Sequence, residues 1–274
     1  RSYDLSPLFD DIASMKELNS RCETFVLGSD QLLYHDLYKS FGMFIDMSYI
    51  QANKRKIAYA TSLGRTVFDG TEEERAQLSL WLQQYDFISV REDSCVDVMR
   101  DTFGVSASHV LDPVFLCPTY EYEQMAELAE PVCEKPFLAA YILDPTPDKE
   151  MFLRYWAEKT GLELMVFSDV AHQSGSIENM WSLSADIVAS NERWLRSIRD
   201  CSFFISDSFH GISFAIIFQK QFICIANPYR GITRFQSLFN GLNLLDRMVI
   251  NVQQPFENDL LDKPIDYEHV NALL

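Results

Sequence analysis

Residues 203–226 read FFISDSFHGISFAIIFQKQFICIA, and this stretch decides the fold class. It opens with a short apolar run at 203–206, continues with an apolar segment of helical length at 208–219, and closes with a second apolar run at 222–226. A buried strand, a helix and another buried strand in succession form a unit whose two strands are parallel. The sequence therefore predicts an α/β protein.

The same alternation extends in both directions along the chain. Expected strands lie at 24–27, 56–60, 87–90, 110–111, 137–143 and 162–167, and further expected helices at 71–85, 93–103, 148–160, 191–200 and 233–240. Thr71 and Glu74 have the spacing of a capping box, and Gly104 stands just past an expected helix end. We expect parallel sheets with helices on both faces.

The alternation lapses between Cys117 and Pro136, an acidic stretch with three prolines, which predicts a linker. We therefore expect a first domain at 1–118, a second at 134–245, and a C-terminal tail at 246–274 that could pack back on the first domain. The chain has 274 residues, roughly 1.8 times a typical domain of about 150 residues, which allows for one large or two small domains.

The composition excludes several classes of protein. Hydrophobic residues make up 47% and charged residues 23% of the chain, values typical of globular proteins and not of disordered chains, collagen or coiled coils. Forty acidic against 23 basic residues give a net charge of −17, which repels nucleic acids and anionic lipid headgroups. No apolar stretch approaches the roughly 18 residues that span a bilayer. We expect neither a nucleic-acid partner nor a transmembrane segment.

The cysteines and most histidines give no sign of a disulfide framework or a metal site. Six cysteines are scattered without a Cys-x-x-Cys pair, which favours reduced thiols in a cytoplasmic protein. Four histidines lack the spacing of metal ligands: His35, His109, His172 and His269. We therefore expect no metal and no resident cofactor.

Short polar segments directly follow several of the expected strands. They lie at 28–30, 61–62, 91–93, 112 and 207–211. Ligands of open α/β sheets bind beyond the carboxyl ends of the strands, where these segments fall. Ser29, Asp30 and Ser62 are therefore candidate substrate-binding residues. Solvation of a turn would explain any one of these segments taken alone.

The segment at 206–211, SDSFHG, is the strongest candidate for catalysis. Ser208 is placed to cap the helix that follows, and His210 falls in its first turn beside backbone N–H groups that favour an anion. A histidine there can act as a general acid or base near neutral pH, and Asp207 could orient its imidazole. The competing interpretation is a histidine hydrogen-bonded inside the core.

Three arginines are candidate anion ligands at the same edge: Arg91, Arg230 and Arg234. In a chain of net charge −17, an arginine beyond a strand end is a natural clamp for a carboxylate or a phosphate. Arg91 could instead pair with a neighbouring carboxylate, and the other two could stack on a neighbouring aromatic ring.

Taken together, six of these segments resemble the polysaccharide pyruvyl transferase family. In the family's order they are FVLGSDQ at 25–31, YATSLG at 59–64, ISVRE at 88–92, VLDP at 110–113, SDSFHG at 206–211, and Arg230-Gly231 with Arg234-Phe235. Each segment is short, but their order over residues 23–245 makes a specific signature.

The resemblance implies a glycosyltransferase-B-like fold, in which two Rossmann-like domains face each other across a cleft. It implies transfer of pyruvate from phosphoenolpyruvate to a pair of hydroxyls on a saccharide, free or lipid-linked, as a ketal in surface polysaccharide synthesis. A lipid-linked acceptor would bring the enzyme to the membrane periphery. Family members usually begin with a strand and an Asn/Gly-rich loop that have no match here, so we expect the first domain to be incomplete at its N-terminus.

In this interpretation His210 is the general acid and base, Asp207 orients it, and Ser208 with the arginines binds the donor's anionic groups. Two alternatives stay open: a nucleotide-sugar glycosyltransferase of similar fold, and a non-catalytic saccharide-binding module. The sequence contains no Gly-x-Gly-x-x-Gly or Walker loop and no Gly-x-Ser-x-Gly elbow, so dinucleotide binding, P-loop chemistry and serine hydrolysis have no local support.

Overall fold

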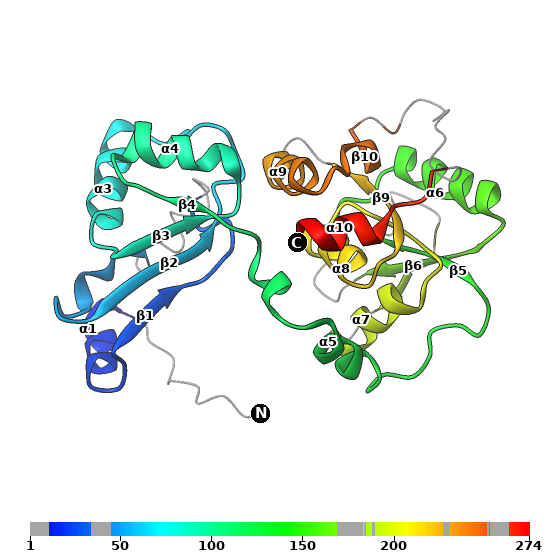
Figure 1. Cartoon of the computed structure of the whole chain (residues 1–274), viewed down its shortest axis with the longest axis horizontal. Coiled ribbons are helices and arrows are strands. Elements are labelled where there is room, and N and C mark those ends of the chain that lie inside the picture. The colour runs from blue at the N-terminus through cyan, green and yellow to red at the C-terminus, as the bar shows by residue number, and fades with distance from the viewer. Residues whose placement is uncertain are drawn as a thin grey trace. The chain divides into compact units, whose positions relative to one another are not determined.

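The computed structural model describes residues 11–33, 45–168, 183, 185–187, 190–226, 231–250, 252 and 263–274 (Figure 1). The chain divides into two compact units, Arg1–Pro113 and Val114–Leu274. Each unit contains its own parallel sheet, so the chain has the α/β class that the sequence predicts.

The sheet of the first unit has four parallel strands in the order β1-β2-β3-β4. The strands are β1 (Thr24–Leu27), β2 (Arg55–Thr61), β3 (Phe87–Val90) and β4 (Ser108–His109). The helical segments are α1 (Ile12–Met15), η1 (Lys16–Ser20), η2 (Met47–Tyr49), α3 (Glu72–Leu82), α4 (Asp93–Phe103) and, across the boundary between the units, η3 (Pro113–Leu116).

The core of the first unit lies on one face of its sheet. Leu27 and Ala58, which are register partners on β1 and β2, pack in one cluster with Leu78 of α3 and Met99 of α4. The start of α3 and the end of α4 match signals in the sequence. Thr71 and Glu74 form the predicted capping box at α3, and Gly104 ends α4 with a φ of 69°.

The other face of the same sheet is partly open. Val26 is paired with Ile57, and Ile57 with Phe87, so the three side chains form one row across the sheet. Val26 is 60% exposed and Phe87 47% exposed. A parallel sheet is normally covered on both faces, so this row marks where the first unit departs from a fully layered domain.

The sheet of the second unit has six parallel strands in the order β10-β9-β8-β5-β6-β7. The strands are β5 (Phe137–Tyr141), β6 (Glu163–Ser168), β7 (Ala185–Ile187), β8 (Phe203–Ser206), β9 (Gln221–Ile225) and β10 (Met248–Val249). The helical segments are α5 (Thr119–Ala126), α6 (Pro147–Thr160), α7 (Asn191–Asp200), α8 (Phe209–Ile217), α9 (Ile232–Leu242), η5 (Leu245–Arg247) and α10 (Tyr267–Leu273).

Helices cover both faces of this second sheet. On one face, Trp156 of α6 is fully buried and stacks on Phe203 of β8, with ring centroids 5.7 Å apart. On the other face, Phe222 of β9 packs against Phe239 of α9, with ring centroids 5.8 Å apart. All four strand residues of β8 are buried, as expected for a central strand of a doubly covered parallel sheet.

The segment predicted to be a linker differs from the sequence expectation. The expected linker contains the helix α5, which packs against α7. Glu127, just past α5, accepts hydrogen bonds from Arg196 and Arg199 of α7 at 3.0 and 2.5 Å. These contacts hold an acidic, proline-flanked segment in place, and the sequence of the segment alone does not reveal them.

The described parts of the C-terminal tail pack on the second unit. β10 pairs with β9, and α10 contacts α9. Ile265 N donates to the side-chain oxygen of Gln221 at 2.8 Å, and the Tyr267 hydroxyl donates to the backbone oxygen of Lys220. These contacts hold residues 265 and 267 of the tail on the second unit.

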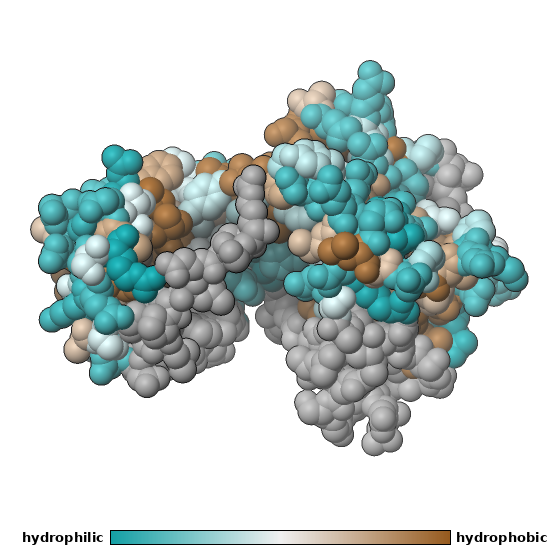
Figure 2. All heavy atoms as spheres, turned by 90° about the horizontal axis from the view of Figure 1, so that it is seen from below, coloured by the Kyte–Doolittle hydropathy of each residue, from teal (hydrophilic) through white to brown (hydrophobic). Residues whose placement is uncertain are grey.

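The surface carries both hydrophilic and hydrophobic residues. In the space-filling view, hydrophilic residues cover much of the described surface and hydrophobic residues occur in small groups (Figure 2). None of the described helices combines the length and the apolar character needed to cross a membrane.

Candidate active site

The strand order singles out one position in the second unit. The chain runs from β5 through β6 to β7 in one direction, then returns to β8 beside β5 and continues to β9 and β10 in the other direction. In open α/β sheets, ligands bind beyond the carboxyl ends of the strands at such a reversal. The described strands of the first unit follow the simple order β1-β2-β3-β4.

The turn between β8 and α8 lies at this reversal and is tied to the end of β5. Ser206 Oγ donates to the backbone oxygen of Tyr141 at 2.5 Å and accepts from Ser208 N at 3.0 Å. Ser208 Oγ in turn accepts from Gly211 N at 3.2 Å, so Ser208 caps α8. The turn is therefore held at both ends by buried serine side chains.

His210 is the second residue of α8 and is half-buried. Every other residue of α8 except Ile217 is buried, so His210 is the side chain of the first turn that reaches toward the surface. Its ring meets the ring of Phe209 edge-on, with centroids 5.7 Å apart. This exposure at a helix N-terminus is what a group that meets an anionic ligand requires.

Arg234 and His210 both contact the ring of Phe209. Arg234 sits in the first turn of α9, directly after Gly231, whose φ of 81° starts that helix. Its Cζ atom is 5.2 Å from the centroid of the Phe209 ring. Because β8 and β9 are neighbours, the helices that follow them begin close together, and Phe209 contacts a histidine and an arginine at once.

Asp207 has different partners from the one that the sequence suggested. Its carboxylate accepts from Leu143 N at 2.6 Å, from Asp144 N at 3.1 Å and from Lys149 Nζ at 2.7 Å. The group that was expected to orient the imidazole of His210 therefore binds the loop after β5 and a lysine of α6. Asp207 lies between β8 and α8, and His210 follows in the first turn of α8.

Gly211 is required where α8 crosses the end of β8. A Cβ atom at this position would lie 2.9 Å from Ser206 Oγ and 3.3 Å from Ser208 Cβ. We expect Gly211→Ala to shift the start of α8, to destabilise the unit by about 1–3 kcal/mol, and to lower activity. Gly241→Ala in α9 is the matched control, because nothing lies within 4 Å of its Cβ position. It should leave the melting temperature unchanged or raised.

In the first unit, Arg91 faces a carboxylate instead of solvent. Its Nη1 is 2.9 Å from Asp112 Oδ2, and both side chains are 1% exposed. Its Nη2 lies 4.0 Å from Asp30 Oδ1, and Asp30 is 69% exposed. This ion pair joins the end of β3 to the segment after β4, and the anion clamp that the sequence suggested stays a prediction.

Ser62 contacts Glu92 at the same edge of the first unit. Ser62 Oγ donates to Glu92 Oε1 at 2.5 Å, Gly64 N donates to the same oxygen at 3.0 Å, and Ser62 and Glu92 are fully buried. A β-bulge between Ala58 and Thr61, with Ala60 at a φ of 49°, precedes Ser62. Bulges of this kind re-aim the residues that follow and are frequent beside functional sites.

The remaining predicted residues fall in two groups. Ser29 is half-buried and Asp30 exposed beyond the end of β1. Arg230 lies outside the described residues. The structure therefore brings Asp207, Ser208, His210 and Arg234 together in the second unit, and Ser62, Arg91 and Asp30 to one edge of the first.

Sequence reasoning missed Lys149. It is 7% exposed, and its Nζ also donates to the backbone oxygen of Asp144 at 2.7 Å. A charged residue at the third position of a helix normally indicates a solvent-facing side chain. The one signal in the sequence was the positive charge of Lys149, because a lysine in the first turn opposes the helix dipole.

Three of the six cysteines are buried. Burial raises the pKa of Cys201 to about 12 and also raises the pKa of Cys95 and Cys224, so these thiols stay protonated at neutral pH. Among the described residues, the His, Cys, Asp and Glu side chains form no cluster of three that could hold a metal ion.

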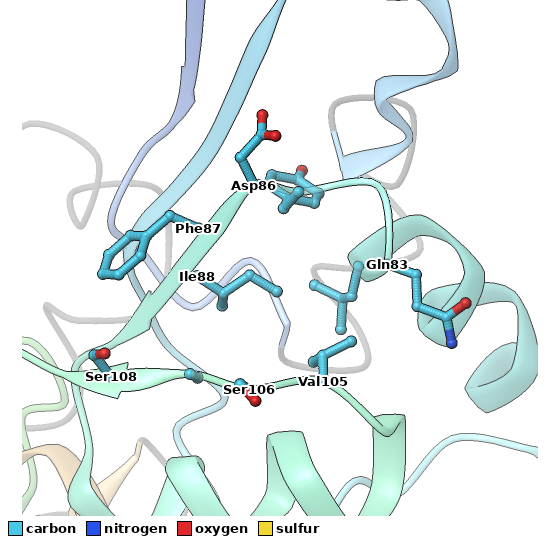
Figure 3. Close-up of a pocket in the computed structure, with 10 residues that line it drawn as sticks. Gln83, Asp86, Phe87, Ile88, Val105, Ser106 and Ser108 are labelled. Atoms are coloured by element: carbon cyan, nitrogen blue, oxygen red, sulfur yellow. The ribbon is translucent and has the colours of Figure 1, made fainter. Parts of the chain in front are cut away.

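A pocket of about 400 Å³ lies in the first unit but at the opposite edge of its sheet (Figure 3). It is lined by the end of α3, by Asp86 and Phe87 at the start of β3, and by 105–108. The amino ends of parallel strands are not the ligand-binding edge of such sheets. We do not assign this pocket to the site.

Comparison with known families decides the membership of the chain. A model of the polysaccharide pyruvyl transferase family matches residues 3–229. The chain belongs to the polysaccharide pyruvyl transferase family. The matched range includes Ser29 and the turn that holds His210. A search of curated proteins finds no match.

Solved structures match this chain at low sequence identity. The apo structure of OtsA is 11% identical, with a TM-score of 0.50, and the alignment covers 96% of this chain and 70% of that one. The crystal structure of the glycotransferase of kitacinnamycin is 11% identical, with a TM-score of 0.42 over 99% of this chain and 80% of that one.

Proposed function

We propose that the protein transfers pyruvate from phosphoenolpyruvate to two hydroxyls of a saccharide and thereby forms a ketal. Membership in a transferase family supports the class of reaction. The observation that carries the proposal is the pair of groups that flank Phe209. His210 and Arg234 stand in the first turns of two neighbouring helices, beyond the carboxyl ends of β8 and β9.

The donor has two anionic groups, a phosphate and a carboxylate. Arg234 supplies a cation that can bind either group through two parallel hydrogen bonds. The first N–H groups of α8 supply a second anion-binding position, and the helix dipole favours negative charge there. Arg230, outside the described residues, stays a candidate for the second cation.

The chemistry needs one group that moves protons. The methylene carbon of the donor gains a proton, and the first saccharide hydroxyl loses one as its oxygen bonds to the neighbouring carbon. The second hydroxyl then attacks the same carbon, the bond to the phosphate oxygen breaks, and inorganic phosphate leaves with the second proton. We assign to His210 the transfer of the proton from hydroxyl to carbon, because an imidazole exchanges protons near neutral pH.

We assign a supporting role to the edge of the first unit. Arg91 and Asp112 keep this edge in place, and Ser29 and Asp30, which are more exposed, are proposed to contact the acceptor. The placement of the two domains across a substrate cleft, the cytoplasmic location and attachment to the membrane through a lipid-linked acceptor stay predictions.

The identity of the donor is tested by measuring which donor binds and which products form. We expect phosphoenolpyruvate to raise the melting temperature and nucleoside-diphosphate sugars to leave it unchanged. With a saccharide acceptor, inorganic phosphate and a new ketal methyl signal in the proton NMR spectrum should appear in equal amounts. Stabilisation by nucleotide sugars alone would support a glycosyltransferase, and a lack of response to both donors would support a saccharide-binding module.

Replacing Arg234 tests the donor site itself. We expect Arg234→Gln to weaken phosphoenolpyruvate binding by roughly 10- to 100-fold, because a hydrogen bond to a charged group contributes about 1.5–3 kcal/mol. Isothermal titration calorimetry gives the dissociation constant. Arg154→Gln makes the same change on the exposed part of α6, where Arg154 pairs with Glu150, and should leave affinity unchanged. Equal affinities of the two variants would remove Arg234 from the donor site.

A further inference from the structure

Lys149 is a buried charge in an unfavourable position. It is the third residue of α6, whose first turn is capped by Thr146 and also contains Asp148 and Glu150. Acidic residues suit a helix N-terminus and a lysine does not, because the backbone N–H groups there carry partial positive charge. Lys149 is also only 7% exposed, so its ammonium group loses most of its hydration.

The ammonium group is matched by two oxygen acceptors. Lys149 Nζ donates to Asp207 Oδ2 at 2.7 Å and to the backbone oxygen of Asp144 at 2.7 Å. Asp144 N donates back to Asp207 Oδ2 at 3.1 Å, which closes a ring of hydrogen bonds. Leu143 N donates to the other carboxylate oxygen of Asp207, Oδ1, at 2.6 Å. The pair therefore joins the loop after β5, the first turn of α6 and the turn after β8.

The same pair lies close in sequence to the candidate catalytic residue, because Asp207 precedes His210 by three residues. Asp207 stands between Ser206, which binds the end of β5, and Ser208, which caps α8. His210 follows two residues after the cap. A carboxylate fixed at 207 thus sets where α8 starts and where its first turn presents the imidazole.

Stability alone does not account for such a pair. A buried ion pair often stabilises a fold no more than well-packed apolar residues of similar volume would, because desolvation offsets the attraction between the charges. A basic residue in the first turn of a helix opposes the helix dipole. Where such a residue brings no gain in stability, it is typical of a position that serves function.

We propose that Lys149 is a positioning residue, which fixes Asp207 and thereby holds the first turn of α8 and His210 in the geometry needed for reaction. The expected effect of Lys149 on the reaction rate rests on the proposed function, whereas its expected effect on the geometry of the turn does not. Misplacement of a catalytic group by about 1 Å can cost roughly 100-fold in rate.

The test replaces Lys149 with methionine and follows two independent signals. The first is the rate. At a temperature where all proteins are folded, Lys149→Met should lower kcat by roughly 10- to 100-fold and change the KM for phosphoenolpyruvate much less. The second is NMR: amide exchange at Leu143 and Asp144 should be at least about tenfold faster, and the ring Cε1–H signal of His210 should shift.

Two further variants separate positioning from folding. Lys159→Met makes the same change on the exposed end of α6 and should leave the rate, both amides and the His210 signal unchanged. If Lys149→Met fails to fold, the double variant Lys149→Met, Asp207→Asn removes both buried charges. This double variant should melt close to the wild type and still have a lowered kcat and a shifted His210 signal.

The outcomes are distinct for the two proposals. A folded Lys149→Met protein with wild-type amide exchange and a wild-type His210 signal would overturn the positioning role, whatever reaction the protein catalyses. If the wild type transfers no pyruvate but the variant shows the expected NMR changes, the proposed function fails and the positioning role stands. Activity that merely follows the folded fraction would make Lys149 a structural residue and overturn the proposal.

Discussion

Replacing His210 with alanine is expected to lower the rate of pyruvyl transfer by about 10²- to 10⁴-fold, the usual cost of losing a general acid or base. The fold should survive, because His210 is half-buried in the first turn of α8 while its neighbours in that helix are buried. Alanine also favours helical backbone, so no helix propensity is lost. Melting temperature and kcat are to be measured on the same sample.

His269→Ala is the matched control for this change. His269 is an exposed residue of another helix of the same unit, α10, where its Nε2 lies 3.2 Å from Asn243 Nδ2. This control should keep both the rate and the melting temperature. If His210→Ala instead melts several degrees lower and keeps a near-normal specific activity, His210 is a core residue and the catalytic assignment is lost.

Replacing Arg91 with methionine should have the largest effect on stability. The variant leaves the Asp112 carboxylate, 1% exposed, without the cation 2.9 Å away. Removal of one partner of a buried pair typically costs about 3–5 kcal/mol. The transition of the first unit in differential scanning calorimetry should therefore fall by roughly 10 °C or more. Adding Asp112→Asn should recover much of the loss, because both charges are then gone.

Arg100→Met provides the surface comparison. Arg100 pairs with Asp97 and Asp101, but its side chain is 63% exposed, and water screens these pairs. Its loss should leave the transition in place. An Arg91→Met protein that melts normally and binds phosphoenolpyruvate weakly would restore the anion clamp that the sequence first suggested.

Local signals in the sequence predicted most of the fold. The capping box at Thr71 and the glycines at 104 and 161 mark helix ends through backbone geometry that few other residues adopt, and they lie at the ends of α3, α4 and α6. Helix α5 was not predicted, because its stability comes from contacts with α7 that lie about 70 residues away in sequence.

The residues of the candidate site also divide into those that local sequence could reveal and those that it could not. His210 and Ser208 could be found because a strand, a cap and a first turn follow each other directly in the sequence. The partners of Asp207 and Arg91 could not, because a buried charge and an exposed one look alike in a sequence. Lys149 has the composition of a surface residue, and only the position of its partner, 58 residues later, shows that it is buried in a pair.

The reversal of strand order between β5 and β8 also bears on how the protein folds. The bonds that build the site join residues far apart in the chain: Tyr141 with Ser206 at a separation of 65, Leu143 with Asp207 at 64, and Lys149 with Asp207 at 58. Closing loops of this length costs entropy before any contact repays it, so such contacts form slowly. On the ribosome, a chain that has not yet released residue 207 can hold α6 but not the ring of hydrogen bonds around Lys149. The turn after β8 therefore acquires its final form later than α6, whose residues precede it in the chain.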